Sequence, residues 1–316
     1  MTATAVRTRA LTKHFGDVIA LDGVDLDVPA GQVHGLVGPN GAGKTTLLGL
    51  LLGLARATSG SLEVLGVDLA APGPAPAAVT GFVDGPGLYP TLTARQNLAA
   101  VAALRPGGSG PDVAALLDRV GLLDVADDAI RGFSLGMRQR LGLAAALVGD
   151  PWLLVVDEPA NGLDPAGKRQ VHRVLTELAS EGRTVILSSH RMDDLAALCD
   201  EVTLLSAGRV VFTGPIRKLV AESGELDYEL VTSDPVTARR LAASTPSLRV
   251  VTAPAVADDA AALVVRGPEV ALDSLVSGLV AAGVAIRGLA PVVPPLEAAF
   301  LALTGVTDAR TTQEDA

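Results

Sequence analysis

Short apolar runs alternate with amphipathic segments along the first part of the chain. The nearly continuous apolar runs are residues 32–37, 152–156 and 184–187. Such runs are typical of strands that are buried on both faces of a parallel sheet. The segments with helical spacing are residues 45–52, 94–104, 112–120 and 134–148. A period of two over residues 18–28 predicts a β-rich lead-in that covers residues 6–28. Strands alternating with helices predict an α/β domain.

The pattern changes near residue 223. It then predicts, in order, strand 226–231, helix 236–243, strand 248–251, strand 261–265, helix 270–281 and strand 284–289. This β-α-β-β-α-β order predicts a small α+β, ferredoxin-like domain. A last helix is expected over 295–303 and a disordered tail over 307–316. We therefore expect a first domain over 1–222 and an accessory or regulatory C-terminal domain over 223–306.

Composition and net charge exclude some classes of function and partner. Apolar residues make up 49% of the 316 residues and aromatics only 3%, so the core must consist of Ala, Leu and Val. The net charge of −10 argues against nucleic acid as the main partner, because phosphate neutralisation needs clustered Lys and Arg. The lone Cys199 cannot form an internal disulfide, which favours a reducing compartment. Neither a signal peptide nor a membrane-spanning run is expected, so any membrane role would need a partner.

A phosphate-binding loop lies between the first buried strand and the helix after it. It matches G-x-x-x-x-G-K-[ST], and its residues are Gly38, Pro39, Asn40, Gly41, Ala42, Gly43, Lys44, Thr45 and Thr46. Gly38, Gly41 and Gly43 permit positive φ, which turns backbone N–H groups inward as an anion nest. Lys44 can neutralise the β- and γ-phosphates, and the Thr45 hydroxyl can complete a Mg²⁺ shell. The alternative is a glycine-rich turn with a chance lysine.

Paired acids end the second apolar run. Asp157 at the predicted strand end can hold Mg²⁺ directly or through water. Glu158 can orient or deprotonate an attacking water. The alternative, a solvated Asp-Glu turn, does not account for the apolar run before the pair or the phosphate loop upstream.

Other polar positions fall at helix starts and strand ends. Ser134 is the expected N-cap of helix 134–148, and its hydroxyl and the helix start can bind a γ-phosphate; the alternative is simply a capped helix. Residues 161–164 form a tight turn, and Pro165 suits the first position of the next helix. His190 follows a buried strand and can reach phosphate or water, whereas His14, His34 and His172 are interpreted as structural.

In this order the motifs resemble the ATPase subunit of ATP-binding-cassette (ABC) transporters, over roughly residues 5–222. The resemblance implies a P-loop NTPase fold with a helical subdomain. It makes residues 38–46 the Walker A motif, 133–137 the signature, 153–158 Walker B and 161–164 the D-loop. His190 becomes the switch histidine. Phe15 becomes the aromatic residue that stacks on adenine, with a core phenylalanine as the alternative.

Two positions depart from the family pattern. Leu135 stands where the signature Leu-Ser-Gly-Gly-Gln has its first glycine. The resemblance implies that Ser134 and Gly136 keep the essential phosphate contacts. Asp84 falls at the Q-loop glutamine, where its carboxylate could still reach Mg²⁺; the alternative is that Asp84 only begins the turn at Gly85-Pro86. Both departures, and a C-terminal segment like residues 295–305, resemble the drug- and antibiotic-export branch, which includes bacitracin- and daunorubicin-resistance ATPases.

The resemblance implies an ATP-hydrolysing motor that dimerises around two ATP molecules with Mg²⁺ and drives a separate membrane permease from the cytoplasmic face. The alternative is an ABC ATPase acting on ribosomes or in DNA repair. Ribosome-acting forms usually carry two cassettes, and repair forms insert a long coiled coil, whereas here only 90 residues separate Lys44 from Ser134. A degenerate nucleotide-binding regulator is disfavoured because Lys44, Asp157, Glu158 and His190 are all present.

Overall fold

The computed structural model describes residues 3–69, 75–104, 112–221, 225–251 and 262–304. The chain divides into two compact units, residues 1–216 and 217–316. The domain boundary expected at 222/223 and the expected tail over 307–316 lie outside the described residues.

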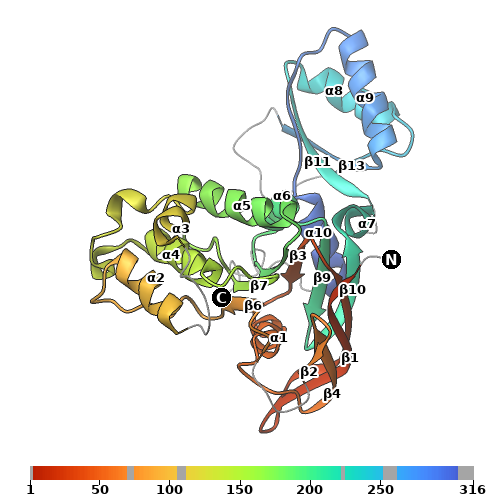
Figure 1. Cartoon of the computed structure of the whole chain (residues 1–316). Coiled ribbons are helices and arrows are strands. Elements are labelled where there is room, and N and C mark those ends of the chain that lie inside the picture. The colour runs from red at the N-terminus through yellow and green to blue at the C-terminus, as the bar shows by residue number, and fades with distance from the viewer. Residues whose placement is uncertain (1–2, 70–74, 105–111, 222–224, 252–261, 305–316) are drawn as a thin grey trace, which may run out of the picture. The chain divides into compact units, whose positions relative to one another are not determined.

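A six-stranded sheet forms the centre of the first unit, in the order β10-β9-β3-β8-β7-β6 (Figure 1). Its strands are β3 (Val33–Val37), β6 (Val79–Phe82), β7 (Leu153–Asp157), β8 (Thr184–Ser188), β9 (Glu201–Ser206) and β10 (Arg209–Pro215). All neighbours pair in parallel except β9 and β10. Every residue of β3, β7 and β8 is buried, which confirms the interpretation of the continuous apolar runs.

A second, antiparallel sheet has the order β2-β1-β4-β5. Its strands are β1 (Thr4–Phe15), β2 (Val18–Pro29), β4 (Ser59–Val64) and β5 (Val67–Asp68). The alternation in β2 buries one side of the strand and exposes the other. The predicted β-rich lead-in is therefore confirmed as a hairpin of two long strands.

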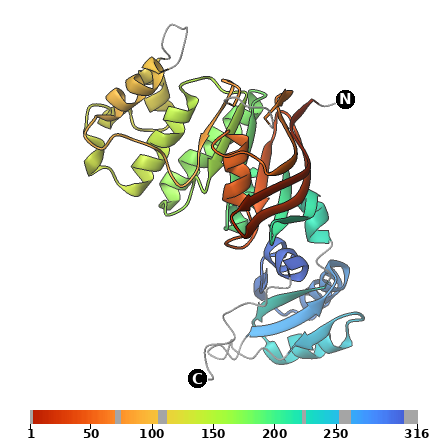
Figure 2. The ribbon, with the colours of Figure 1, turned by 90° about the horizontal axis from the view of Figure 1, so that it is seen from below.

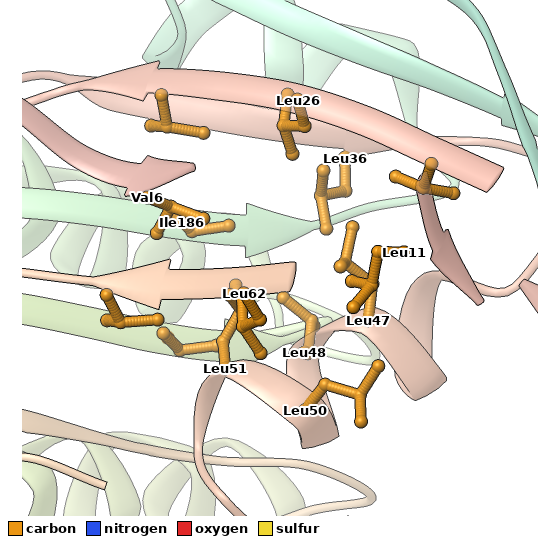
Figure 3. Close-up of a cluster of buried hydrophobic side chains, with 14 of the residues drawn as sticks. Val6, Leu11, Leu26, Leu36, Leu47, Leu48, Leu50, Leu51, Leu62 and Ile186 are labelled. Atoms are coloured by element: carbon orange, nitrogen blue, oxygen red, sulfur yellow. The ribbon is translucent and has the colours of Figure 1, made fainter. Parts of the chain in front are cut away.

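Two helices cover opposite faces of the central sheet in the first unit (Figure 1). Helix α1 (Lys44–Leu51) lies between the two sheets, and Figure 3 shows its Leu48 and Leu51 beside Leu62 of β4 in one buried cluster. Helix α5 (Pro165–Ser180) packs against β3 and β8 on the other face. The core consists almost entirely of Leu, Val and Ala, as the composition predicted.

Three helices gather on one side of the first unit, away from the antiparallel sheet, in both whole-chain views (Figure 2). They are α2 (Ala94–Ala103), α3 (Val113–Arg119) and α4 (Leu135–Leu147), joined by the short 3₁₀ helices η1 (Leu123–Val125) and η2 (Ile130–Gly132). Thr93 and Gln96 form a capping box at the start of α2, and Asp112 caps α3. This group is the expected helical subdomain. The first unit also contains α6 (Met192–Leu198), and α7 (Ile216–Ala221) begins at the boundary between the two units.

The second unit contains an antiparallel sheet in the order β12-β13-β11-β14. Its elements are β11 (Leu226–Thr232), α8 (Pro235–Ser244), β12 (Arg249–Val251), β13 (Ala262–Gly267), α9 (Glu269–Ala281), β14 (Ile286–Pro291) and α10 (Pro295–Thr304). Each pair of strands joined by a helix, β11 with β12 and β13 with β14, has one strand inserted between its members. That arrangement is the split β-α-β of ferredoxin-like domains. Helices α8 and α9 share one buried cluster with the sheet.

Within the described ranges, no helix combines the length and the apolar character needed to cross a membrane.

Candidate active site

The phosphate loop connects the buried end of β3 to the first turn of α1. Gly41 and Gly43 adopt φ of 80° and 101°, as expected. The prediction of positive φ at Gly38 was wrong, because Gly38 is not among the positive-φ glycines. Gly38 is required for space: a Cβ there would lie 2.4 Å from the Leu205 carbonyl oxygen. The backbone therefore enters the loop tightly against β9 before it curls.

Lys44 is held by the loop itself. Its side chain is buried, and Nζ donates to the carbonyl oxygens of Gly38 at 2.8 Å and Pro39 at 3.2 Å. Burial lowers the pKa of Lys44, while the nearby charges of Glu158 and Asp157 raise it. Two carbonyl groups of the loop thus hold the ammonium group in place.

Asp157 joins the phosphate loop to the strand ends of the central sheet. It is the last residue of β7, and its carboxylate accepts a hydrogen bond of 3.0 Å from the Thr45 hydroxyl. The buried Ser188 hydroxyl donates to the other carboxylate oxygen. The same Ser188 oxygen accepts the Glu158 N–H at 3.0 Å. One hydroxyl group therefore connects both acids, because β7 and β8 are neighbours in the sheet.

Ser188 was not assigned a role from the sequence beyond its place before His190. The available signal was its position: a polar residue that ends a buried parallel strand lies at the same sheet edge as the acids that end the next strand.

Glu158 and His190 form the outer part of the site. Nδ1 of His190 lies 2.9 Å from Oε2 of Glu158. Glu158 adopts φ of 49°, a left-handed conformation that is uncommon for a residue with a Cβ and that concentrates at functional positions. The Ser188 hydroxyl and His190 hold the backbone and the carboxylate of Glu158 in this conformation.

Two cavities meet at this point. One, of about 460 Å³, is lined by residues 40–46 and 18–20 together with Asp84, Asp157 and Glu158. The other, of about 560 Å³, is lined by the same three acids, by Gly85, Pro86 and Leu88, and by Leu135 of the signature. Asp84 borders both cavities, yet it also adopts φ of 59° immediately before Gly85. The described residues contain no group of three or more His, Cys, Asp or Glu side chains close enough to hold a metal by themselves.

The remaining predicted residues do not line the phosphate-loop cavity. Ser134 is the N-cap of α4 and accepts the Met137 N–H at 3.2 Å, as predicted for a capped helix. Phe15 is 53% exposed at the end of β1, with the Lys13 ammonium 4.7 Å from its ring centroid, so it is not a core residue. Phe15, Ser134 and Gly136 are not among the described residues that line this cavity.

Comparison with known proteins follows the same motifs. The ABC transporter family matches residues 21–161, from β2 to the D-loop. The chain is 36% identical to the daunorubicin resistance ATP-binding protein of Streptomyces coeruleorubidus over 313 residues, 96% of this chain and 97% of that protein. It is 37% identical to the bacitracin transport ATP-binding protein of Enterococcus faecalis over 208 residues, 65% of this chain and 68% of that protein.

Solved structures give the same fold. An ATP-binding subunit of an ABC transporter superposes with a TM-score of 0.62 at 26% identity, covering 69% of this chain and 93% of that structure. Since the similarity to the first relative runs through both units, the match is not limited to the phosphate loop. The resemblance expected from the motifs is confirmed: the chain belongs to the ABC transporter family and is one of its ATPase subunits.

Proposed function

We propose that this ATPase hydrolyses Mg-ATP at residues 38–46, with Glu158 as the general base, and powers a separate membrane permease. The observation that carries the proposal is the continuous hydrogen-bond path from the loop to the outer acid, Thr45–Asp157–Ser188–Glu158–His190. It connects the group that would bind phosphate with the group that would activate water.

The donor set fits Mg²⁺. The Thr45 hydroxyl and the Asp157 carboxylate are hard oxygen ligands, and they lie next to each other at the loop. Mg²⁺ usually keeps waters and phosphate oxygens in its shell, so two protein ligands suffice. When bound, the ion would neutralise charge on the phosphates. Asp84 is proposed as a further contributor through the Q-loop position, because it borders the same cavity.

The residues of the chain divide the chemistry among them. Lys44 would bind the β- and γ-phosphates as a charged donor. Glu158 would accept the proton of a water in line with the γ-phosphate. His190 would hold the Glu158 carboxylate through Nδ1 and present its other ring nitrogen to the reacting phosphate. Gly41, Gly43 and the start of α1 would supply backbone N–H groups to the phosphates.

Two copies would complete each site. Ser134 and Gly136 lie at an exposed helix start that does not border the phosphate loop of their own chain, so we propose that they bind the γ-phosphate held by a second copy. ATP would then join two surfaces that do not close on it alone, and loss of the γ-phosphate would weaken the dimer. Phe15 is exposed and is proposed to stack on adenine.

An apolar groove in the first unit is the proposed docking site of the permease. It has a volume of about 350 Å³ and is lined by apolar residues that include Leu54, Phe82, Leu88 and Ala145. Leu54 is 70% exposed. We propose that a cytoplasmic segment of the permease docks there, next to Asp84, and that this contact keeps the chain at the cytoplasmic face of the membrane.

The relatives indicate the class of cargo. Because they are named for daunorubicin resistance and bacitracin transport, we propose drug or antibiotic efflux. The second unit, which the first relative's alignment also spans, is proposed as an accessory or regulatory domain.

The test is Glu158→Gln, which keeps the shape of the side chain and removes its basicity. Turnover should fall about 10²-fold or more, while ATP still binds and size-exclusion chromatography with Mg-ATP reports a stable dimer. Glu181→Gln is the matched control, because Glu181 is a half-exposed acid at the end of α5 that pairs only with Arg119 among the described contacts. A Glu158→Gln protein with near wild-type turnover would remove Glu158 from the mechanism.

A further inference from the structure

The signature turn and the D-loop of the same chain pack against each other through two leucines and two glycines. A Cβ placed on Gly162 would lie 2.7 Å from Cδ2 of Leu135. In the opposite direction, a Cβ placed on Gly136 would lie 3.2 Å from Cδ2 of Leu163. Each leucine thus occupies the space that the other segment leaves open by having glycine. We call these four residues the Leu–Gly interlock.

The interlock connects two segments that serve different phosphates in the proposed mechanism. Leu135 directly follows Ser134 at the start of α4. Gly162 and Leu163 lie in the turn that follows Glu158, where the Asn161 N–H donates to the Glu158 carbonyl at 3.1 Å and the Asp164 side chain caps α5. Helices α4 and α5, whose starts carry the two segments, contact each other within the first unit (Figure 1). The path from Ser134 to Glu158 through the interlock is therefore short.

The Leu135 side chain is what makes this contact possible. A glycine at position 135, as in the usual signature, would have no atoms to reach Gly162. Gly162 in turn has φ of 70°, so the turn itself disfavours a side chain that could fill the gap from the other side. Leu135 remains 53% exposed, so the contact with the D-loop uses only part of its surface.

We propose that Leu135 is a positioning residue that fastens the signature turn to the D-loop of its own chain, so that a displacement beside Glu158 is transmitted to Ser134. This inference rests on the proposed function for its catalytic consequence, whereas the contact itself is packing between side chains and backbone of one chain. Close-packed side chains transmit such a displacement because small gaps forfeit much of their dispersion contact. Leu135 acts through Ser134 and touches no substrate.

The test combines two readouts on the full-length protein. Leu135→Ala should increase hydrogen exchange at the backbone amides of Asn161 and Leu163 about fivefold in the absence of nucleotide. It should also lower kcat about fivefold, while KM for ATP stays within about twofold, because the phosphate loop is untouched. Leu135→Met, which replaces the branched side chain with a flexible apolar side chain of similar reach, should restore both values. Leu104→Ala is the control, since Leu104 is a 78% exposed leucine at the end of α2 in the same helical group.

A double-mutant cycle of Leu135→Ala and Leu163→Ala shows whether the two leucines act on kcat together or independently. The interlock predicts that the double variant loses no more kcat than the worse single variant. The inference would be overturned if the kcat losses of the two single variants multiply in the double variant. Unchanged hydrogen exchange at residues 161–163 in the Leu135→Ala protein would also overturn it. If the wild-type chain lacks Mg-ATPase activity, the proposed function fails, and the exchange cycle alone decides on the interlock because it needs no hydrolysis.

Discussion

The phosphate loop and the signature turn are both proposed to bind phosphate, yet the chain constructs them differently. The phosphate loop lies between a fully buried strand and the first helix, and its lysine is already held by two loop carbonyls. The signature turn begins a helix with an exposed cap, and the Ser134 hydroxyl accepts only an N–H of its own helix in the described contacts. One surface is preorganised by its own chain. The other is available for a ligand that a different chain presents.

The difference explains why the departures from the family pattern fall where they do. The phosphate loop tolerates little change, because Gly38 and Gly43 would place a Cβ within 2.4 and 2.5 Å of backbone carbonyl oxygens. The signature turn has open space on one side, and Leu135 fills part of it by contacting the D-loop. Exposed surfaces accept substitutions that a close-packed loop excludes.

The largest expected effect concerns the buried side of this comparison. His34 lies in β3, the strand that leads into the phosphate loop. It is fully buried, and its Nε2 lies 2.8 Å from the Thr203 hydroxyl oxygen. Burial lowers the pKa of His34 to about 4. The unfolded chain has a His pKa near 6.5, so it binds more protons between about pH 6.5 and 4, and stability is lost as the pH falls through that window. The loss should reach about 3 kcal/mol.

Urea unfolding at pH 7 and pH 4.5 measures this loss. His34→Gln keeps a hydrogen-bonding side chain but does not titrate, so its free energy of unfolding should fall less on acidification than that of the wild type. If the free energies of unfolding of the two proteins fall equally on acidification, burial in β3 does not keep His34 neutral.

The next effect compares the two phosphate surfaces directly. Lys44→Ala should raise the Kd of the isolated protein for ATP about 30-fold, because it removes a charged donor to phosphate. Ser134→Ala should change that Kd by less than about twofold while it reduces hydrolysis, if Ser134 binds the phosphate of a second copy as proposed. Nucleotide titration of the monomer at low protein concentration measures both. Equal losses of ATP affinity would place Ser134 at the nucleotide of its own chain.

The smallest expected effect concerns Asp84, which borders both cavities. If the Asp84 carboxylate contacts the metal, Asp84→Asn should raise the Mg²⁺ concentration for half-maximal activity about threefold, because a negative charge near the ion is lost. The left-handed conformation of Asp84 is also what a simple turn would require, and Asn tolerates it equally well. Titration of ATPase activity with Mg²⁺ distinguishes the two roles, and an unchanged Mg²⁺ dependence would assign Asp84 to the turn.

Much of this molecule could be predicted from local pattern. Continuous apolar runs gave the buried strands β3, β7 and β8, and the cap of α4 at Ser134 followed from residue type. In the second unit the order of predicted elements led to the sheet order that the structure has. These features depend on residues close together in the sequence, so their periodicity is visible without the fold.

What could not be predicted depends on distant contacts. Gly38 is needed because Leu205 of β9 approaches it, and no local pattern reports that approach. Ser188 joins Asp157 and Glu158 only because β7 and β8 are neighbours. The contact of Leu135 with Gly162 likewise requires the packing of α4 on α5. The sequence predicted most of the candidate site residues, but it did not predict the contacts that Ser188 and Leu135 make with distant segments.

The central claim is that the preorganised loop of one copy and the exposed turn of another enclose one ATP. Mixing the Lys44→Ala and Ser134→Ala proteins tests it most directly, because each variant alone forms dimers in which both sites are damaged. A heterodimer has one site that combines the intact loop of the Ser134→Ala copy with the intact turn of the Lys44→Ala copy. With random exchange, the equimolar mixture should regain about a quarter of wild-type ATPase activity. A mixture no more active than the average of the two variants would contradict the account.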